Sequence, residues 1–398
     1  MAMLPIEDLQ QRPPLTGWAP FALGFRPFFL SAGIYAVLMM VLWLLFLRGS
    51  LTLGSLSPFV WHGHEMLFGF AVAVIAGFLL TAAQNWTGIS TPSGLPLAAL
   101  FLLWLAGRVG FLVPGLPPVL VAAIDLAFLP VLAIALAVPV LKARQLHNYP
   151  FPLMLLVLAA ANALVHAGSL EWIAAGGSLG LHLATYVIVM MMTVMGGRVI
   201  PSFTDNKLRT RARRWKAIEI LVPAFTLAAL IAALAAPFSA VTAALAALAA
   251  VTHGVRLAGW YTNKYWSVPL LWILHLGYAW IPIGFALLAL SAAGFGAAAG
   301  SALHAFTAGA IGTLTLGMMA RVSLGHSGRM LEPAPLMTWA FVAVNLAALI
   351  RVAQPLLFPG LYMSGMLIAG ILWIAAFGLF AAIYTPILLR PRVDGKPG

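Results

Sequence analysis

The sequence predicts an all-α integral membrane protein with about twelve transmembrane helices. Of its 398 residues, 63% are hydrophobic and only 8% are charged, and the mean hydropathy is +1.03. Soluble domains are about half apolar and about a quarter charged. A soluble fold of this length would therefore lack the charged side chains needed to cover its surface. Apolar stretches of about 20 residues, enough to cross the hydrocarbon core, recur along the whole chain.

Twelve such stretches are bounded by proline, glycine or charged residues. They are residues 28–47, 63–83, 97–113, 119–141, 151–169, 179–199, 217–236, 238–257, 267–291, 298–320, 336–354 and 361–388. The boundary at Pro237 is the least distinct of these. The longest loop, near 200–216, is too short for a soluble electron-carrier or nucleotide-binding domain. Any chemistry must therefore take place inside the helical bundle.

The basic residues predict the orientation. If both termini are cytoplasmic, all of the 21 Lys and Arg residues except Arg48, Arg108 and Arg351 fall in cytoplasmic segments. This is a strong positive-inside bias, so the net charge of +12 indicates topology and not nucleic-acid binding. We expect a cytoplasmic segment at 1–27, one membrane domain at 28–389 and a cytoplasmic tail at 390–398.

The chain contains no cysteine. This excludes disulfides, thiolate metal sites, iron–sulfur clusters and covalently attached c-type haem. A metal would have to be held by His, Met, Tyr or carboxylate side chains.

Histidines recur near the predicted outer ends of the second, sixth and tenth stretches. His64, His182 and His304 are separated by 118 and 122 residues, the length of about four helices with their loops. Fixed internal periods indicate structural repeats. We expect three four-helix units, near 28–142, 151–257 and 267–389, arranged as three arcs around a pseudo-threefold axis. Each unit would place a histidine at the same depth.

Ionisable residues inside a membrane are costly unless they are paired or face a cavity. We therefore interpret His62, His64, His182 and His304 as haem or metal ligands. His62 and His64 are two residues apart, so on a helix they point in different directions and cannot chelate one ion. Glu65 lies three residues from His62 and is a candidate partner for it, or a proton relay.

Further candidates lie on other stretches. His166 and His275 are additional candidate metal ligands, and Tyr278 shares a helix face with His275 and is a candidate catalytic residue. Arg108 and Asp125 face each other at one depth of a predicted hairpin and should form an ion pair. His147 and His253 lie in basic flanks, where we expect them to be solvated. Several methionines could bind copper(I), although soft packing is their more common role.

Several unusual runs resemble the NnrS family, and they extend from residue 24 to 329. They are GFRPFF (24–29), WHGHEMLFGF (61–70), NWTG (85–88), GGRVIP (196–201), HLGYAW (275–280) and RVSLGHSGR (321–329). The resemblance implies a bacterial inner-membrane protein of twelve spans that contains haem and copper. It also implies a role in the response to nitric oxide, in nitrosative stress and in denitrification.

A weaker, architectural resemblance connects the chain with haem–copper oxidases and nitric oxide reductases. Their twelve core helices form three arcs, and their ligands lie on the second, sixth, seventh and tenth helices. The predicted seventh helix here has no histidine. A three-histidine copper site of that type would therefore need His166, His275 or another ligand.

The leading hypothesis is a protein that binds and reduces nitric oxide with non-covalent b-type haem and copper, using membrane quinol as electron donor. One alternative is a non-catalytic sensor or carrier of nitric oxide, haem or metal. Another is a transporter, in which helices interrupted at midplane are expected. Gly196–Gly197, Gly309, Gly312 and Gly317 are candidate interruptions.

Overall fold

The computed structural model describes residues 17–51, 56–296 and 298–396. Within these ranges the chain is helical, with no strand. The all-α membrane class predicted from the sequence is confirmed, because eleven described helices are long and apolar enough to cross a membrane. Most of the predicted N-terminal segment, residues 1–16, lies outside the described residues.

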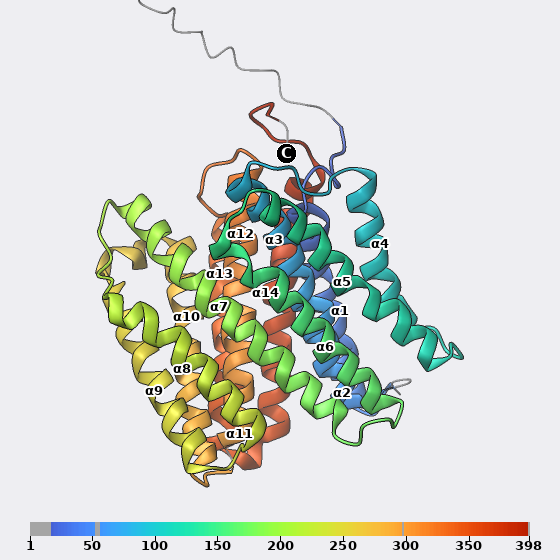
Figure 1. The fold of residues 1–398 in the computed structure, drawn as a ribbon, viewed down its shortest axis with the longest axis vertical. Helices are drawn as coiled ribbons and strands as arrows, with labels where there is room; N and C mark the ends of the chain where they lie inside the picture. The colour runs from blue at the N-terminus through green and yellow to red at the C-terminus, as the bar shows by residue number, and fades with distance from the viewer. Residues whose placement is uncertain (1–16, 52–55, 297, 397–398) are drawn as a thin grey trace, which may run out of the picture.

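The described helices form twelve spans, and two of them combine α-helix with a π-helical segment (Figure 1). In chain order they are α1 (Phe25–Leu47), α2–η1–α3 (Pro58–His64, Glu65–Ala71, Val72–Thr87), α4 (Leu95–Gly110), α5 (Pro118–Lys142), α6 (Pro150–Ser169), α7 (Gly176–Leu208), α8 (Lys216–Ala235), α9 (Ala240–Gly259), α10 (Pro269–Ala292), α11–η4–α12 (Ala298–His304, Ala305–Ile311, Gly312–His326), α13 (Pro335–Leu357) and α14 (Tyr362–Leu389). Short 3₁₀ turns lie at Leu146–Asn148, Asn263–Ser267 and Pro359–Leu361.

Local sequence explains where these helices begin. Pro58, Pro118, Pro150, Pro269 and Pro335 each occupy the first turn of a helix. Proline suits this position because its fixed φ is helical and its missing N–H would have no intrahelical partner.

Each predicted apolar stretch corresponds to one of these spans, and the break at Pro237 falls between α8 and α9. The exception in length is α4, whose 16 residues extend only about 24 Å. It is therefore shorter than the hydrocarbon core of about 30 Å.

The spans form one bundle with a continuous hydrophobic core. In Figure 1, α1, α2 and α4 to α6 lie on one side, α8 to α10 lie on the other, and α12 to α14 run between them. Helix α7 packs on α6, while α14 packs on both α1 and α13. The beginning and the end of the membrane domain are thus in contact.

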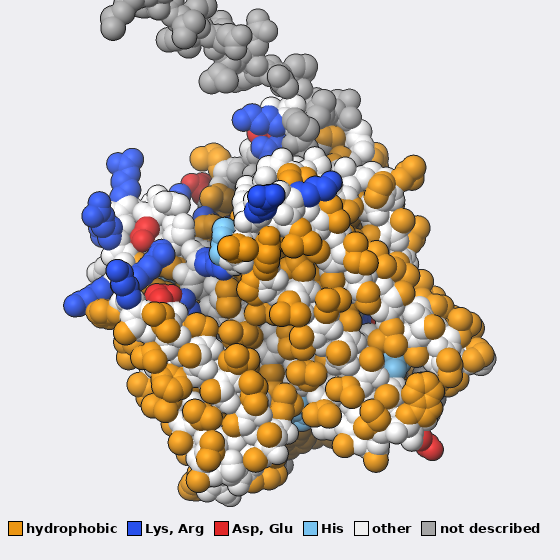
Figure 2. Space-filling model, in the orientation of Figure 1, with side chains coloured by type: hydrophobic (Ala, Val, Ile, Leu, Met, Phe, Trp, Pro, Cys, Tyr) orange, Lys and Arg blue, Asp and Glu red, His pale blue; other side chains and the backbone are white. Residues whose placement is uncertain are grey.

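The two ends of the bundle differ in charge. Figure 2 shows Lys and Arg side chains gathered at the end where the chain terminates, above a broad apolar surface. We call this the basic end; it includes Lys207, Arg211, Lys216 and Arg390. The span that contains His64 begins at the opposite, non-basic end with Pro58.

A buried histidine–carboxylate cluster as candidate metal site

Three histidines occupy the same position in their spans. His64, His182 and His304 are each the seventh residue of a long helical span, counted from its non-basic end. They therefore lie at a similar depth. The three-unit repeat stays a prediction, and this shared position supports it.

Two of these spans share a second feature. A seven-residue π-helical segment follows directly after His64 and again after His304. Both spans also close on a glycine 24 residues further on, Gly88 and Gly328, and each glycine has a positive φ of 68° or 76°. Short π-segments are rare and occur often at functional sites. The π-segments thus indicate that the two preceding histidines, His64 and His304, are functional residues.

His64 lies at the centre of a buried polar cluster. Its side chain is fully buried, and both of its ring nitrogens face oxygen atoms. Nδ1 lies 2.7 Å from Oε1 of Glu65. Nε2 lies 2.8 Å from Oδ1 of Asn162 and 3.2 Å from Oδ2 of Asp125. His64 therefore connects the span α2–η1–α3 with α5 and α6.

Asp125 is the second centre of the cluster. Its carboxylate accepts hydrogen bonds from Arg108 on α4 and from Asn162 Nδ2, which lies 2.7 Å away. His166 Nε2 lies 2.8 Å from Oδ2 of Asp125. The predicted Arg108–Asp125 ion pair is confirmed.

Glu65 has partners other than the one expected for it. It accepts hydrogen bonds from Arg108, at 2.9 Å, and from the Tyr35 hydroxyl of α1, and it lies beside His64. The expected pairing of Glu65 with His62 is wrong, because Arg108, Tyr35 and His64 are the groups that the Glu65 carboxylate contacts. The His62 ring stacks instead on Trp43 of α1, with centroids 4.3 Å apart.

The charged side chains of this cluster carry one more negative than positive charge. Glu65 and Asp125 are two carboxylates and Arg108 is one guanidinium, all buried. Asn162 donates its amide to Asp125, so its oxygen is the atom facing His64. All the neighbours of the His64 ring nitrogens are thus acceptors. The cluster is balanced by one further proton, held by a histidine or a carboxyl group, or by a bound metal ion in place of that proton.

The donor set suits a metal. One ligand atom each from His64, Asp125 and His166 lies within 4.8 Å of the others, and all three side chains are buried. Imidazole and carboxylate together bind copper, iron and zinc ions. Glu65, Asn162 and Arg108 surround these atoms with hydrogen bonds, as outer partners of a metal site do. Sequence reasoning named His64 and His166 as ligands, but treated Asp125 only as a partner of Arg108.

The other predicted ligands lie outside this cluster. The Nδ1 atom of His182 is 2.8 Å from the carbonyl of Ser178, and that of His304 is 2.7 Å from the carbonyl of Gly300. In both residues the proton is thereby placed on Nδ1, and Nε2 is left as the atom able to bind a metal. His62 and His304 are close enough to interact electrostatically. Each of them also interacts with the charge of Arg351 on α13.

His275 and Tyr278 belong to a different region, nearer the basic end. His275 stacks on Tyr265, with centroids 4.1 Å apart, and its Nδ1 lies 3.0 Å from the carbonyl of Leu271. The Tyr278 hydroxyl lies 2.8 Å from Nδ1 of His253 and accepts a hydrogen bond from Arg256. The expectation that His253 is solvated is wrong, because α9 turns this residue toward α8 and α10.

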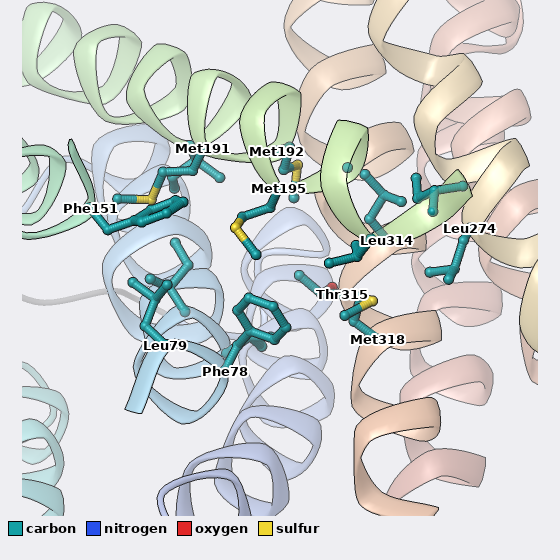
Figure 3. A pocket seen from close by; sticks show the side chains of 16 residues that line it. Phe78, Leu79, Phe151, Met191, Met192, Met195, Leu274, Leu314, Thr315 and Met318 are labelled. Carbon is teal, nitrogen blue, oxygen red and sulfur yellow. The ribbon is translucent and has the colours of Figure 1, made fainter. Parts of the chain in front are cut away.

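Four of the methionines line an apolar cavity of about 100 Å³ between α3, α7 and α12 (Figure 3). Met191, Met192, Met195 and Met318 border it together with Phe78. Its lining is almost entirely apolar, which suits a small uncharged molecule and soft packing alike.

A fold of twelve spans around a buried histidine–carboxylate cluster defines a multi-pass integral membrane protein with a candidate metal site inside the bundle. No curated protein matches the chain. The chain belongs to the NnrS family, whose model, described as NnrS protein, matches residues 19–392. This match covers all twelve spans and the whole cluster.

Proposed function

We propose that this protein binds nitric oxide at a metal centre in the non-basic half of the bundle and reduces it. The buried cluster of His64, Asp125 and His166 is the observation that carries this proposal. Membership of the NnrS family supports the choice of nitric oxide, which that family is expected to meet in nitrosative stress and denitrification. A neutral diatomic gas reaches such a site through the bilayer and needs no polar entrance.

The donor atoms fit copper and haem at different places. His64, His166 and Asp125 would hold copper, since imidazole and carboxylate are ligands for Cu(II). His304 would hold a non-covalent b-type haem through Nε2, with His62 as a further ligand. Arg351 lies near His62 and His304 and offers a positive charge for the haem carboxylates. When bound, the metals supply a site for nitric oxide and a store of electrons.

The protein's own side chains would deliver protons. Reduction of two molecules of nitric oxide to nitrous oxide and water takes up two electrons and two protons. Glu65 is the candidate relay, because its carboxylate contacts both the His64 ring and the Tyr35 hydroxyl. Arg108 donates to both carboxylates of the cluster and would hold them in place when a proton is transferred.

The charge distribution supports an orientation with both termini in the cytoplasm of a bacterium. The basic end then faces the cytoplasm, and the cluster lies in the outer half of the inner membrane. Electrons would come from membrane quinol, since no loop among the described residues is long enough for a carrier domain.

The test is consumption of nitric oxide by the purified protein with a reduced quinol under anaerobic conditions. Turnover with formation of nitrous oxide is expected. Binding of nitric oxide without turnover would instead identify a sensor or carrier. The transporter alternative gains little support from α7, because this helix continues without interruption through Gly196 and Gly197. Their lack of side chains makes room for Tyr278 and Arg256.

A further inference from the structure

A second cavity lies between α7, α8, α10 and α11, apart from the His64 cluster. Its volume is about 330 Å³. Ser178, His182, Tyr186 and Ser291 bring polar groups to it, while Leu288 and Phe306 are among its apolar walls. It is therefore amphipathic, unlike the cavity bordered by the methionines.

His182 presents a proton acceptor in this cavity. Because Nδ1 donates to the carbonyl of Ser178, Nε2 carries the free lone pair. Tyr186 lies one turn further along α7, and its ring centre is 6.1 Å from that of His182. A ligand with an O–H group could donate to His182 while its ring packs on the apolar walls.

We propose that this cavity binds the ring of a quinol and is the site where electrons enter the protein. The proposal rests on the proposed function, whose electron donor it places. Oxidation of one quinol gives a quinone, two electrons and two protons. Nε2 of His182 would accept the first proton from the ring hydroxyl, and the second would pass to water. One electron would reduce a bound haem iron and the other a bound copper ion, since each of these centres accepts a single electron.

The position of the cavity favours electron transfer toward His304. Ala302, Leu303 and Phe306 form its wall on the α11 side, and His304 follows Leu303 directly. A ring in the cavity would therefore lie beside the residue that we propose as a haem ligand. An amphipathic cavity inside an apolar bundle also suits a ring that carries two hydroxyl groups and enters from lipid.

The experiment uses the full-length protein in nanodiscs, loaded with haem and copper, and a photoreactive short-chain quinone as probe. Two variants alter the cavity by different means. His182→Phe removes the acceptor, whereas Ala302→Phe fills the space without changing a polar group. His147→Phe is the matched control, because His147 is exposed at the basic end. Each protein is also assayed for haem content, and for nitric oxide consumption with dithionite in place of quinol.

In the wild type we expect labelled peptides from α7 or α11. Both cavity variants should bind quinone about tenfold more weakly, since His182→Phe loses a hydrogen bond and Ala302→Phe loses packing space. The control should bind normally. Labelling elsewhere, or unchanged quinone affinity in both cavity variants, would overturn the proposal. Loss of haem from Ala302→Phe would also overturn it, because the cavity would then be assigned to haem. A wild type that binds quinone here but consumes no nitric oxide with dithionite would refute the proposed function and leave the cavity assignment intact.

Discussion

The carboxylate of Asp125 on α5 pairs with the guanidinium of Arg108 on α4, inside the membrane domain. The remaining oxygen of Asp125 faces His64, Asn162 and His166. Asp125 thus joins a structural ion pair to a candidate metal site. Substitutions can separate these two roles.

Asp125→Asn should lower stability strongly, because it leaves the buried Arg108 without one of its carboxylates. Breaking a buried ion pair from one side costs about 3–5 kcal/mol. The double variant Arg108→Met with Asp125→Leu removes this ion pair but leaves the buried Glu65 carboxylate without its guanidinium, so it should recover little of that stability. Thermal unfolding in detergent measures both effects, and elemental analysis measures the metal.

Neither of these variants should retain the metal, because both lack the carboxylate ligand. A double variant that is stable and still binds one equivalent of metal would show that Asp125 is only structural.

Glu65→Gln should preserve the metal and slow the chemistry. The amide keeps the size of the side chain and can still contact His64, but it cannot carry a proton. A positioned general acid or base contributes about 10²–10⁴-fold to a rate. We expect nitric oxide consumption to fall within that range at unchanged metal content. Glu171→Gln, in the exposed loop after α6, is the control. Loss of the metal from Glu65→Gln would make Glu65 a part of the binding site instead.

Gly197→Ala should destabilise the protein, since the added methyl group would collide with the Arg256 guanidinium. Overpacking of this kind costs about 1–3 kcal/mol. Gly254 directly follows His253 on α9 and has open space around it. Gly254→Ala should therefore be neutral or gain about 0.5–1 kcal/mol. Thermal unfolding of the two variants provides the comparison, and equal stability would indicate that α7 flexes at Gly197.

The C-terminal tail should detach at low pH. Arg392 hydrogen-bonds Asp394 and lowers the pKa of that carboxyl to about 2. A lowered folded-state pKa stabilises the docked tail above the ordinary carboxyl pKa of about 4. This contribution is lost as the pH falls from there through about 2. Arg392, held by Asp394, also donates to the carbonyl of His326, 2.9 Å away, and Val393 donates its amide to the carbonyl of Ser327. Through these bonds the tail is attached to the end of α12.

Because the chain lacks cysteine, a spin label at Lys396→Cys reports on the tail alone. The label should be restrained at pH 6 and mobile near pH 2. With the added substitution Asp394→Asn it should be mobile at both. A label that is equally restrained throughout would show that Asp394 does not hold the tail.

The spans were predictable because hydropathy and proline positions act locally. The Arg108–Asp125 pair was predictable as well, since an antiparallel hairpin brings residues at the same depth together. The surroundings of His64 were not. Tyr35 and Asn162 reach this site from α1 and α6, and only the packing of separate helices determines that convergence.

The two errors have different causes. His253 was expected in solvent because Arg256 and a basic loop are near it in sequence, yet one face of α9 is turned inward. Glu65 was placed with His62 by helical spacing alone, but Arg108 on α4 and Tyr35 on α1 are its partners. A single sequence gives no clear signal for partners that come from separate helices.

Metal content of the purified protein, after expression with haem and copper supplied, tests the central claim most directly. Wild type, His64→Ala and the exposed-site control His147→Ala are compared, with an optical spectrum before and after exposure to nitric oxide. We predict that wild type and the control contain metal and respond to nitric oxide, and that His64→Ala lacks one equivalent. A wild type free of metal, or a His64→Ala variant with unchanged metal and spectrum, would contradict the account.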